Sequence, residues 1–104
     1  MADSTFRKSV LLLMGEIPLG AVTTYGDIAS YAGNPRAARI VGGIAHFGPE
    51  STPWHRLVNR NGGLASGYPG GREVQKQLLE QEGVVCSEDY YVVDFHQCRW
   101  RRHE

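Results

Sequence analysis

The sequence lacks long hydrophobic runs and a surplus of charge of either sign. No segment approaches the roughly 20 apolar residues that cross a bilayer, and the start Met1-Ala2-Asp3-Ser4 does not resemble a signal peptide. Eleven basic and eleven acidic residues give a formal net charge of zero, which argues against a generic polyanion-binding protein. These absences predict a cytoplasmic protein with no membrane partner.

Cysteine is also scarce. The two cysteines, Cys86 and Cys98, lie in the C-terminal quarter without the paired spacing of metal ligands. Nothing indicates export, so both are expected to be reduced thiols. The sequence therefore predicts no metal site and no cofactor. The length of 104 residues suits one domain, residues 1–104, that buries its own core, and a monomer is expected.

Apolar periodicity predicts a helical N-terminal half. A first amphipathic helix is expected after an N-cap at Ser4 or Thr5, and residues 18–20 are expected to end it. Its buried stripe recurs at helical spacing: Phe6, Val10, Leu13 and Ile17. We expect this helix to be purely structural.

Residues 22–46 predict two further short helices. Thr24 and Asp27 fit the capping box of the first, and Gly33 is suited to end it. Asn34 is placed to cap the next helix and Pro35 to take its first position. Two helices joined by so tight a turn are typical of a helix-turn-helix motif, although the spacing alone fits an ordinary helical hairpin equally well.

The second of these helices has two distinctive faces. The expected buried stripe consists of Ala37, Val41 and Ile44. The other face carries small residues and one arginine: Pro35, Ala38, Arg39, Gly42 and Ala45. Reading bases in the major groove favours several long polar side chains. This face instead favours close approach to a groove floor, with Arg39 inserted into the base stack.

The most distinctive stretch is Pro53-Trp54-His55-Arg56. An Asn-Gly turn at residues 59–62 follows, then a glycine-rich loop at residues 67–71 and a helix that Gly83 is expected to end. In this order the residues resemble the active-site region of the O6-alkylguanine-DNA alkyltransferases, whose Pro-Cys-His-Arg motif holds the alkyl-accepting cysteine. Trp54 stands at the cysteine position, the hallmark of the alkyltransferase-like proteins. The resemblance extends from about Phe6 to Gly83.

The second half carries less regular patterns. Residues 56–58 and 63–65 are expected to form a small hairpin or wing around the Asn-Gly turn. Val74, Leu78 and Leu79 form the expected apolar stripe of the following helix. Residues 90–95 are typical of a β-strand that pairs with residues 84–85, and the tail from Arg99 to His103 is expected to be solvated. We therefore predict an α+β, mainly helical domain of the winged helix-turn-helix type.

The resemblance implies DNA binding from the minor groove, with a tyrosine that rotates the target nucleotide and an arginine that fills the vacated stack. The matching positions form the predicted DNA-binding set: Tyr25, Pro35, Arg36, Ala38, Arg39 and Gly42. The predicted lesion pocket consists of Tyr25, Trp54, Leu57, Ser66, Gly67 and Tyr68. Whether the indole of Trp54 lies inside this pocket or swings aside is not decided by the sequence.

His55 and Glu82 match the pair that generates the thiolate in the alkyltransferases. With no thiol to activate, they are expected to be a structural remnant of this relay, because an indole is not a nucleophile at neutral pH. The resemblance thus implies non-enzymatic recognition of O6-alkylguanine in duplex DNA and hand-over to nucleotide excision repair proteins. The alternatives are a winged-helix transcription factor that binds undamaged DNA and a residual repair enzyme, for which only Glu50 and Glu82 supply acids near the pocket.

Overall fold

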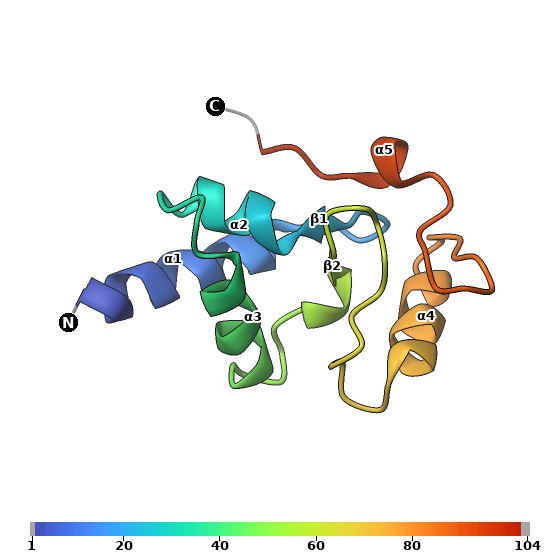
Figure 1. The fold of residues 1–104 in the computed structure, drawn as a ribbon, viewed down its shortest axis with the longest axis horizontal. Coiled ribbons are helices and arrows are strands. Elements are labelled where there is room, and N and C mark those ends of the chain that lie inside the picture. The colour runs from blue at the N-terminus through green and yellow to red at the C-terminus, as the bar shows by residue number, and fades with distance from the viewer. Residues whose placement is uncertain (1, 103–104) are drawn as a thin grey trace.

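The computed structural model describes residues 2–102. Three helices gather at one end of the molecule, α1 (Ala2–Glu16), α2 (Tyr25–Tyr31) and α3 (Ala38–His46), and α4 (Arg72–Gln81) and α5 (Phe95–Cys98) lie at the other (Figure 1). Between them, β1 (Thr23–Thr24) pairs in parallel with β2 (Leu57–Val58), which follows a 3-10 turn at Trp54–Arg56. The described part of the chain is thus mainly helical with a minimal sheet.

The helical end is organised around the apolar stripe of α1. Val10, Leu13, Met14 and Ile17 are each at most 5% exposed and pack against buried residues of α2 and α3. Removing this apolar surface from water drives the three helices together. The expected N-cap at Ser4 or Thr5 is wrong, because α1 already begins at Ala2 and both residues lie inside it.

The start and end of α2 follow from local chemistry. The Thr24 hydroxyl accepts from the Asp27 amide at 2.9 Å, and the Asp27 carboxylate accepts from the Thr24 amide, which confirms the capping box. The helix stops beside Gly33, whose φ of 96° suits a residue without a Cβ. Because Tyr25 is the first residue of α2, the capping box also fixes where its side chain begins.

α3 begins later than predicted. Asn34 caps a turn instead of the helix: its side-chain oxygen accepts from the Arg36 amide at 3.3 Å, and its carbonyl accepts from the Ala37 amide at 3.0 Å. Pro35 therefore lies in this turn, and α3 starts at Ala38. Ala45, placed on the small-residue face, is instead buried in the core at 4% exposure.

The predicted wing hairpin does not form as a pair of strands. The Asn-Gly turn itself closes, with the Asn59 amide donating to the Gly63 carbonyl at 2.8 Å. β2, however, pairs with β1, and the Leu64 amide donates to the Tyr90 carbonyl at 2.9 Å. The predicted strand at residues 90–95 is reduced to isolated bridges, because Tyr90 has a φ of 68° and α5 begins at Phe95. The predicted pairing with residues 84–85 is confirmed in part: the Val93 amide donates to the Val85 carbonyl at 2.9 Å, and Val92 bridges Cys86 one residue further on.

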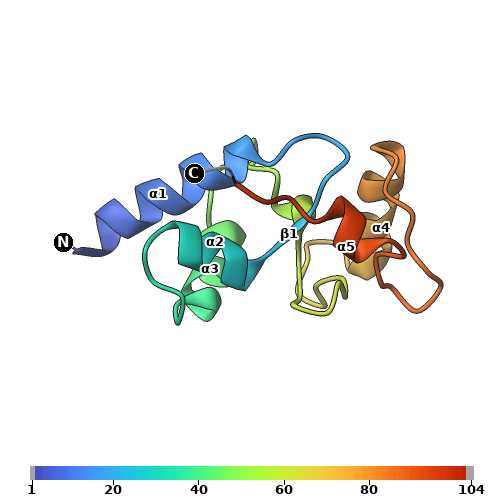
Figure 2. The ribbon, with the colours of Figure 1, turned by 90° about the horizontal axis from the view of Figure 1, so that it is seen from above.

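The tail is solvated only in part. Arg101 and Arg102 are exposed as expected, but Arg99 and Trp100 are partly buried, because the tail packs back onto the helical end (Figure 2). The Val22 amide donates to the Cys98 carbonyl at 3.0 Å and its carbonyl accepts from the Trp100 amide at 2.7 Å, which forms an isolated parallel bridge between Val22 and Arg99. The Arg99 guanidinium donates to both Asp27 carboxylate oxygens, at 2.8 and 2.7 Å. Bidentate pairing of this kind holds a side chain in a fixed orientation. His103 lies outside the described residues.

No helix among residues 2–102 is both long and apolar enough to cross a membrane.

Candidate nucleic-acid interface

Trp54 lies where three elements meet. Its indole nitrogen donates to the Tyr25 hydroxyl oxygen at 3.0 Å. Its ring lies 5.1 Å from the Tyr68 ring and 5.4 Å from the His46 ring, measured between centroids. The side chain is half-buried against the helical core. The indole is therefore held in a ring of aromatic side chains from α2, α3 and the glycine-rich loop.

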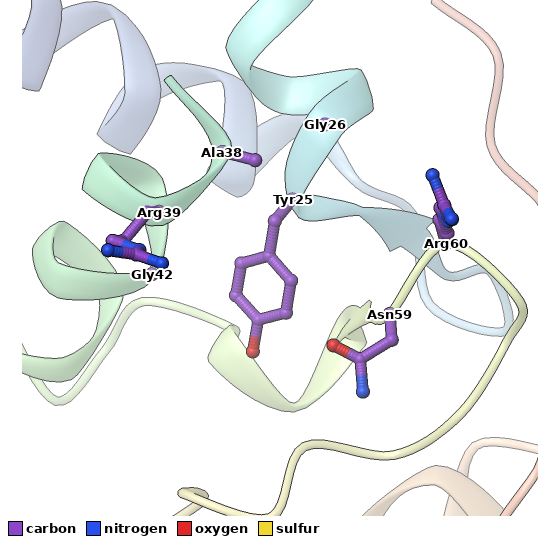
Figure 3. A pocket seen from close by; sticks show the side chains of 7 residues that line it. All are labelled: Tyr25, Gly26, Ala38, Arg39, Gly42, Asn59 and Arg60. Atoms are coloured by element: carbon purple, nitrogen blue, oxygen red, sulfur yellow. The ribbon is translucent and has the colours of Figure 1, made fainter. Parts of the chain in front are cut away.

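A cavity of about 570 Å³ opens beside Tyr25. It is lined by Tyr25, Gly26, Ala38, Arg39, Gly42, Asn59 and Arg60. The side chains of Arg39 and Arg60 lie on opposite sides of the Tyr25 ring (Figure 3). A Cβ added at Gly42 would lie 3.9 Å from that ring, so the small face of α3 brings its backbone close to Tyr25. The result is an open hollow with a cation on each side.

The predicted DNA-binding residues separate into two groups. Tyr25, Ala38, Arg39 and Gly42 come together in this cavity, whereas Pro35 and Arg36 are exposed in the preceding turn and are not among its lining residues.

Sequence reasoning gave no site role to Gly26, Asn59 or Arg60. The β1–β2 register explains their place, because Thr24 pairs with Val58. Parallel strands end at the same edge, so Tyr25 and Asn59 emerge side by side. The sequence feature that could have placed these residues at the site is the short apolar pair Leu57–Val58, which forms β2. Its partner strand could not be identified from the sequence.

The Trp54 indole lines another cavity, of about 260 Å³. It is lined by Ala45, His46, Gly48, Pro49, Glu50, Thr52, Trp54, Tyr68 and Pro69. Of the predicted lesion pocket, it brings together Trp54 and Tyr68. The prediction that Leu57 lines the lesion pocket is wrong. Leu57 is 0% exposed in the core, because β2 is covered on both sides, so its side chain offers no surface to a base. Ser66 and Gly67 are exposed and do not line this cavity.

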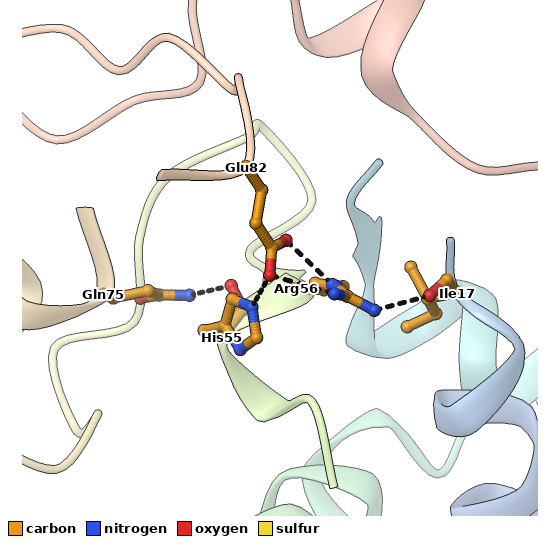
Figure 4. Close-up of polar contacts among 5 residues, drawn as sticks. All are labelled: Ile17, His55, Arg56, Gln75 and Glu82. Carbon is orange, nitrogen blue, oxygen red and sulfur yellow. Dashed lines mark hydrogen bonds and ion pairs between the residues drawn. The ribbon is translucent and has the colours of Figure 1, made fainter. Parts of the chain in front are cut away.

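His55 and Arg56 line neither of these cavities but a third one, of about 450 Å³. Both side chains reach Glu82 (Figure 4). The His55 Nε2 lies 2.8 Å from a Glu82 carboxylate oxygen, and Arg56 donates to both carboxylate oxygens at 2.9 Å. Arg56 also donates to the Ile17 carbonyl at 2.8 Å. The hydrogen bonds from Arg56 lower the pKa of Glu82 to about 2, and His55 contributes to this shift. Burial acts in the opposite direction but is outweighed. Glu82 is therefore an anion with its partners already in place.

Gln75 supports the same turn from the other side. It is 0% exposed, accepts from the Ala65 amide at 2.8 Å and donates to the Leu57 carbonyl at 2.9 Å. It also donates to the His55 carbonyl at 3.0 Å (Figure 4). Every hydrogen-bonding atom of its amide is thus used, which is what burial of a polar side chain requires. Val74, predicted for the buried stripe of α4, is instead 37% exposed.

The cysteines lie away from this site, in the core at the α4 end. Burial and the nearby Glu80 carboxylate raise the pKa of Cys86 to about 11. A thiol with so high a pKa forms very little thiolate at neutral pH, and the thiolate is the nucleophilic form. Cys86 is therefore a structural thiol packed among apolar residues.

The fold and the site define a helix-turn-helix protein of the DNA-alkyltransferase type, with tryptophan at the acceptor position. Residues 5–84 match the family described as 6-O-methylguanine DNA methyltransferase, DNA binding domain. The chain belongs to this family, as an alkyltransferase-like protein.

Two relatives and one methyltransferase illustrate the range of the family. The Escherichia coli DNA base-flipping protein is 43% identical over 100 residues, which cover 94% of this chain and 76% of the relative. Alkyltransferase-like protein 1 of Schizosaccharomyces pombe is 47% identical over 87 residues, 81% of each chain. A methylated-DNA–protein-cysteine methyltransferase of Methanosarcina acetivorans is 42% identical over 80 residues, 75% of this chain and 51% of the enzyme.

Solved structures agree with the sequence matches. S. pombe Atl1 in complex with damaged DNA containing O6-carboxymethylguanine has a TM-score of 0.84 and 36% identity, covering 98% of both chains. Mycobacterium tuberculosis OGT in complex with DNA has a TM-score of 0.69 and 38% identity, covering 75% of this chain and 48% of that one. The predicted fold class, that of the alkyltransferase DNA-binding domain, is confirmed.

Proposed function

We propose that this protein recognises O6-alkylguanine in duplex DNA by rotating the modified nucleotide out of the helix, and that it binds the base without removing the alkyl group. The observation that carries the proposal is Trp54 at the acceptor position. It lines the smaller cavity together with Tyr68 and is hydrogen-bonded to Tyr25, which lines the larger one. An alkyl acceptor is replaced there by an aromatic surface, which suits reversible contact with a planar base.

The cavity beside Tyr25 is suited to the DNA backbone and the vacated stack. Arg39 is exposed and extends from a face of α3 that it shares with Ala38 and Gly42, so it is the long side chain of that face. A guanidinium is planar and stacks on bases, which lets it replace an extruded nucleotide. Extrusion itself costs a few kcal/mol and costs less for a mispaired or damaged base, which favours a lesion over normal DNA.

The groups that would be needed for transfer are occupied or missing. The indole of Trp54 is no nucleophile at neutral pH, and Cys86 is buried with a raised pKa. Glu82 holds His55 and Arg56 together, which gives the former relay a structural role. A complex that forms without transfer dissociates intact. We therefore also propose that nucleotide excision repair proteins complete the repair.

The relatives point the same way. One is named for base flipping, and another has been crystallised with DNA that carries an O6-alkylated guanine. Because cysteine methyltransferases also belong to the family, the non-enzymatic assignment depends on the residues of this chain and not on membership alone.

A binding titration tests the proposal. Fluorescently labelled duplexes that differ only in guanine or O6-methylguanine at one position are titrated with the protein at fixed salt concentration, since affinity depends strongly on salt. We expect the modified duplex to bind at least tenfold more tightly. In a competition assay, the protein should slow repair by an authentic alkyltransferase. Equal affinity for both duplexes would instead favour a protein that reads undamaged DNA.

A further inference from the structure

The hydrogen bond between Trp54 and Tyr25 has a fixed direction. An indole nitrogen can only donate, so the Tyr25 hydroxyl oxygen is the acceptor in this 3.0 Å contact. A phenol carries one proton of its own besides its acceptor lone pairs. With the oxygen engaged by the indole, the Tyr25 proton has to point elsewhere.

No acceptor for that proton lies within hydrogen-bond distance among residues 2–102. The Tyr25 ring lines the larger cavity, between Arg39 and Arg60 (Figure 3). Burial raises the pKa of Tyr25, opposed by the Trp54 hydrogen bond and helped by Tyr68, so the hydroxyl keeps its proton at neutral pH. The half-buried hydroxyl is thus a donor without an intramolecular partner at the edge of an open hollow.

The rest of Tyr25 has little freedom to move. Its backbone opens α2, where the Thr24–Asp27 capping box holds the first turn and Arg99 holds the Asp27 carboxylate in turn. The ring faces Gly42 of α3, where even a Cβ would lie 3.9 Å from it. The remaining freedom is rotation of the hydroxyl about its C–O bond, and this is the freedom that the Trp54 N–H restricts.

We propose that Trp54 is a positioning residue that acts through Tyr25. Its N–H holds the Tyr25 oxygen as an acceptor, so that the Tyr25 hydroxyl is a directed donor to an acceptor atom of the rotated nucleotide. The inference rests on the proposed function, because it needs a nucleotide beside Tyr25. It also gives a reason for tryptophan in particular: phenylalanine would fill the same space but would leave the hydroxyl free to turn.

The first test uses the free protein. In a ¹⁵N–¹H spectrum the indole N–H groups of Trp54 and Trp100 give two signals. The Trp100→Phe variant loses one of them, and the signal that remains belongs to Trp54. We expect Tyr25→Phe to move the Trp54 signal toward that of an indole without an acceptor, and Tyr91→Phe to leave it unchanged. Tyr91 is exposed, and its hydroxyl makes no hydrogen bond among the described residues. A Trp54 signal that does not respond to Tyr25→Phe overturns the inference.

The second test measures coupling on the lesion duplex. Tyr25→Phe should weaken binding about fivefold, the usual effect of one hydrogen bond, and Trp54→Phe should weaken it by no more than that. The double variant should be no weaker than Tyr25→Phe, because phenylalanine at position 54 keeps the aromatic surface and loses only the N–H, which acts through the Tyr25 hydroxyl. Trp100→Phe is the matched control for loss of an indole and should bind normally. Additive losses overturn the inference.

Altered duplexes identify the acceptor. A methylphosphonate 3′ to the lesion removes an anionic phosphate oxygen, and a 3-deaza form of O6-methylguanine removes a base nitrogen. Tyr25→Phe should have no further effect on the duplex that lacks the true acceptor. If it weakens binding to both duplexes equally, the donor role is wrong. If the wild-type protein binds the lesion duplex no more tightly than unmodified DNA, the proposed function is wrong as well. If it prefers the lesion duplex but the binding losses of the Tyr25 and Trp54 variants add up, only this inference is wrong.

Discussion

Trp54 and His55 are neighbours in one 3-10 turn, but Trp54 contacts Tyr25 and His55 contacts Glu82. The regions around Tyr25 and Glu82 differ in how many of their polar side chains have partners within the protein. On the Glu82 side, the carboxylate has three hydrogen bonds from His55 and Arg56, and the Gln75 amide is fully used. On the Tyr25 side, Arg39 and Arg60 are exposed and make no ion pair among the described residues. Paired groups hold a fold together, whereas unpaired groups at a cavity are available to a ligand. We therefore assign stability to the Glu82 side and binding to the Tyr25 side.

The largest effect is expected from breaking the Glu82 side. Glu82→Ala should lower the free energy of unfolding by about 3 kcal/mol, because it leaves Arg56 and His55 without their common partner in a half-buried site. Urea denaturation followed by circular dichroism measures this. Glu80→Ala, which removes an exposed acid two residues earlier at the end of α4, is the matched control and should change stability by less than about 0.5 kcal/mol. An equally small change in Glu82→Ala would contradict the assignment.

The second-largest effect is expected on DNA binding by the Tyr25 side, without a change in the free energy of unfolding. Arg39→Ala should weaken binding of the lesion duplex by about 2 kcal/mol, roughly 30-fold, since no other long side chain on its face of α3 can fill the stack. Fluorescence of 2-aminopurine at the target position should report less extrusion. Arg101→Ala, which removes an exposed arginine from the tail, is the control. Undiminished 2-aminopurine fluorescence with Arg39→Ala would remove Arg39 from this role.

The smallest effect is the pH dependence of stability that Glu82 contributes. The pKa of Glu82 is lowered from 4.5 to about 2, so its charge stabilises the folded state fully above pH 4.5, and this contribution is lost as the pH falls toward 2. Over that range wild type should lose about 1 kcal/mol more stability than Glu82→Gln, after allowance for partial solvent screening. Parallel curves for the two proteins would show that the carboxylate pairing does not stabilise the fold.

Local signals in the sequence predicted the helical half best. The Thr24–Asp27 capping box and the apolar spacing of α1 depend on residues a few positions apart, and both formed as expected. The start of α3 was wrong because Asn34 could cap either a helix or a turn, and the choice depends on how Ala37 packs into the core.

Pairings between distant residues were missed. The parallel contact of β1 with β2, the return of the tail to Asp27 and the hydrogen bonds of Gln75 each join segments far apart in the chain. Neither a two-residue strand nor one glutamine has a periodic pattern that identifies its partner. For the same reason the sequence left the direction of the Trp54 indole open, while the structure places it against Tyr25.

The central claim is that the site binds an alkylated base but leaves the alkyl group on the DNA. Duplex DNA with a radiolabelled O6-methylguanine is incubated with excess protein, and the label is then followed in the DNA digest while mass spectrometry examines the protein. Because Trp54 replaces the acceptor and Cys86 is buried with a raised pKa, we expect the label to remain in O6-methylguanine and the protein mass to stay unchanged. A methyl group on Cys86, Cys98 or any other residue, or release of free methylated base, would contradict the claim.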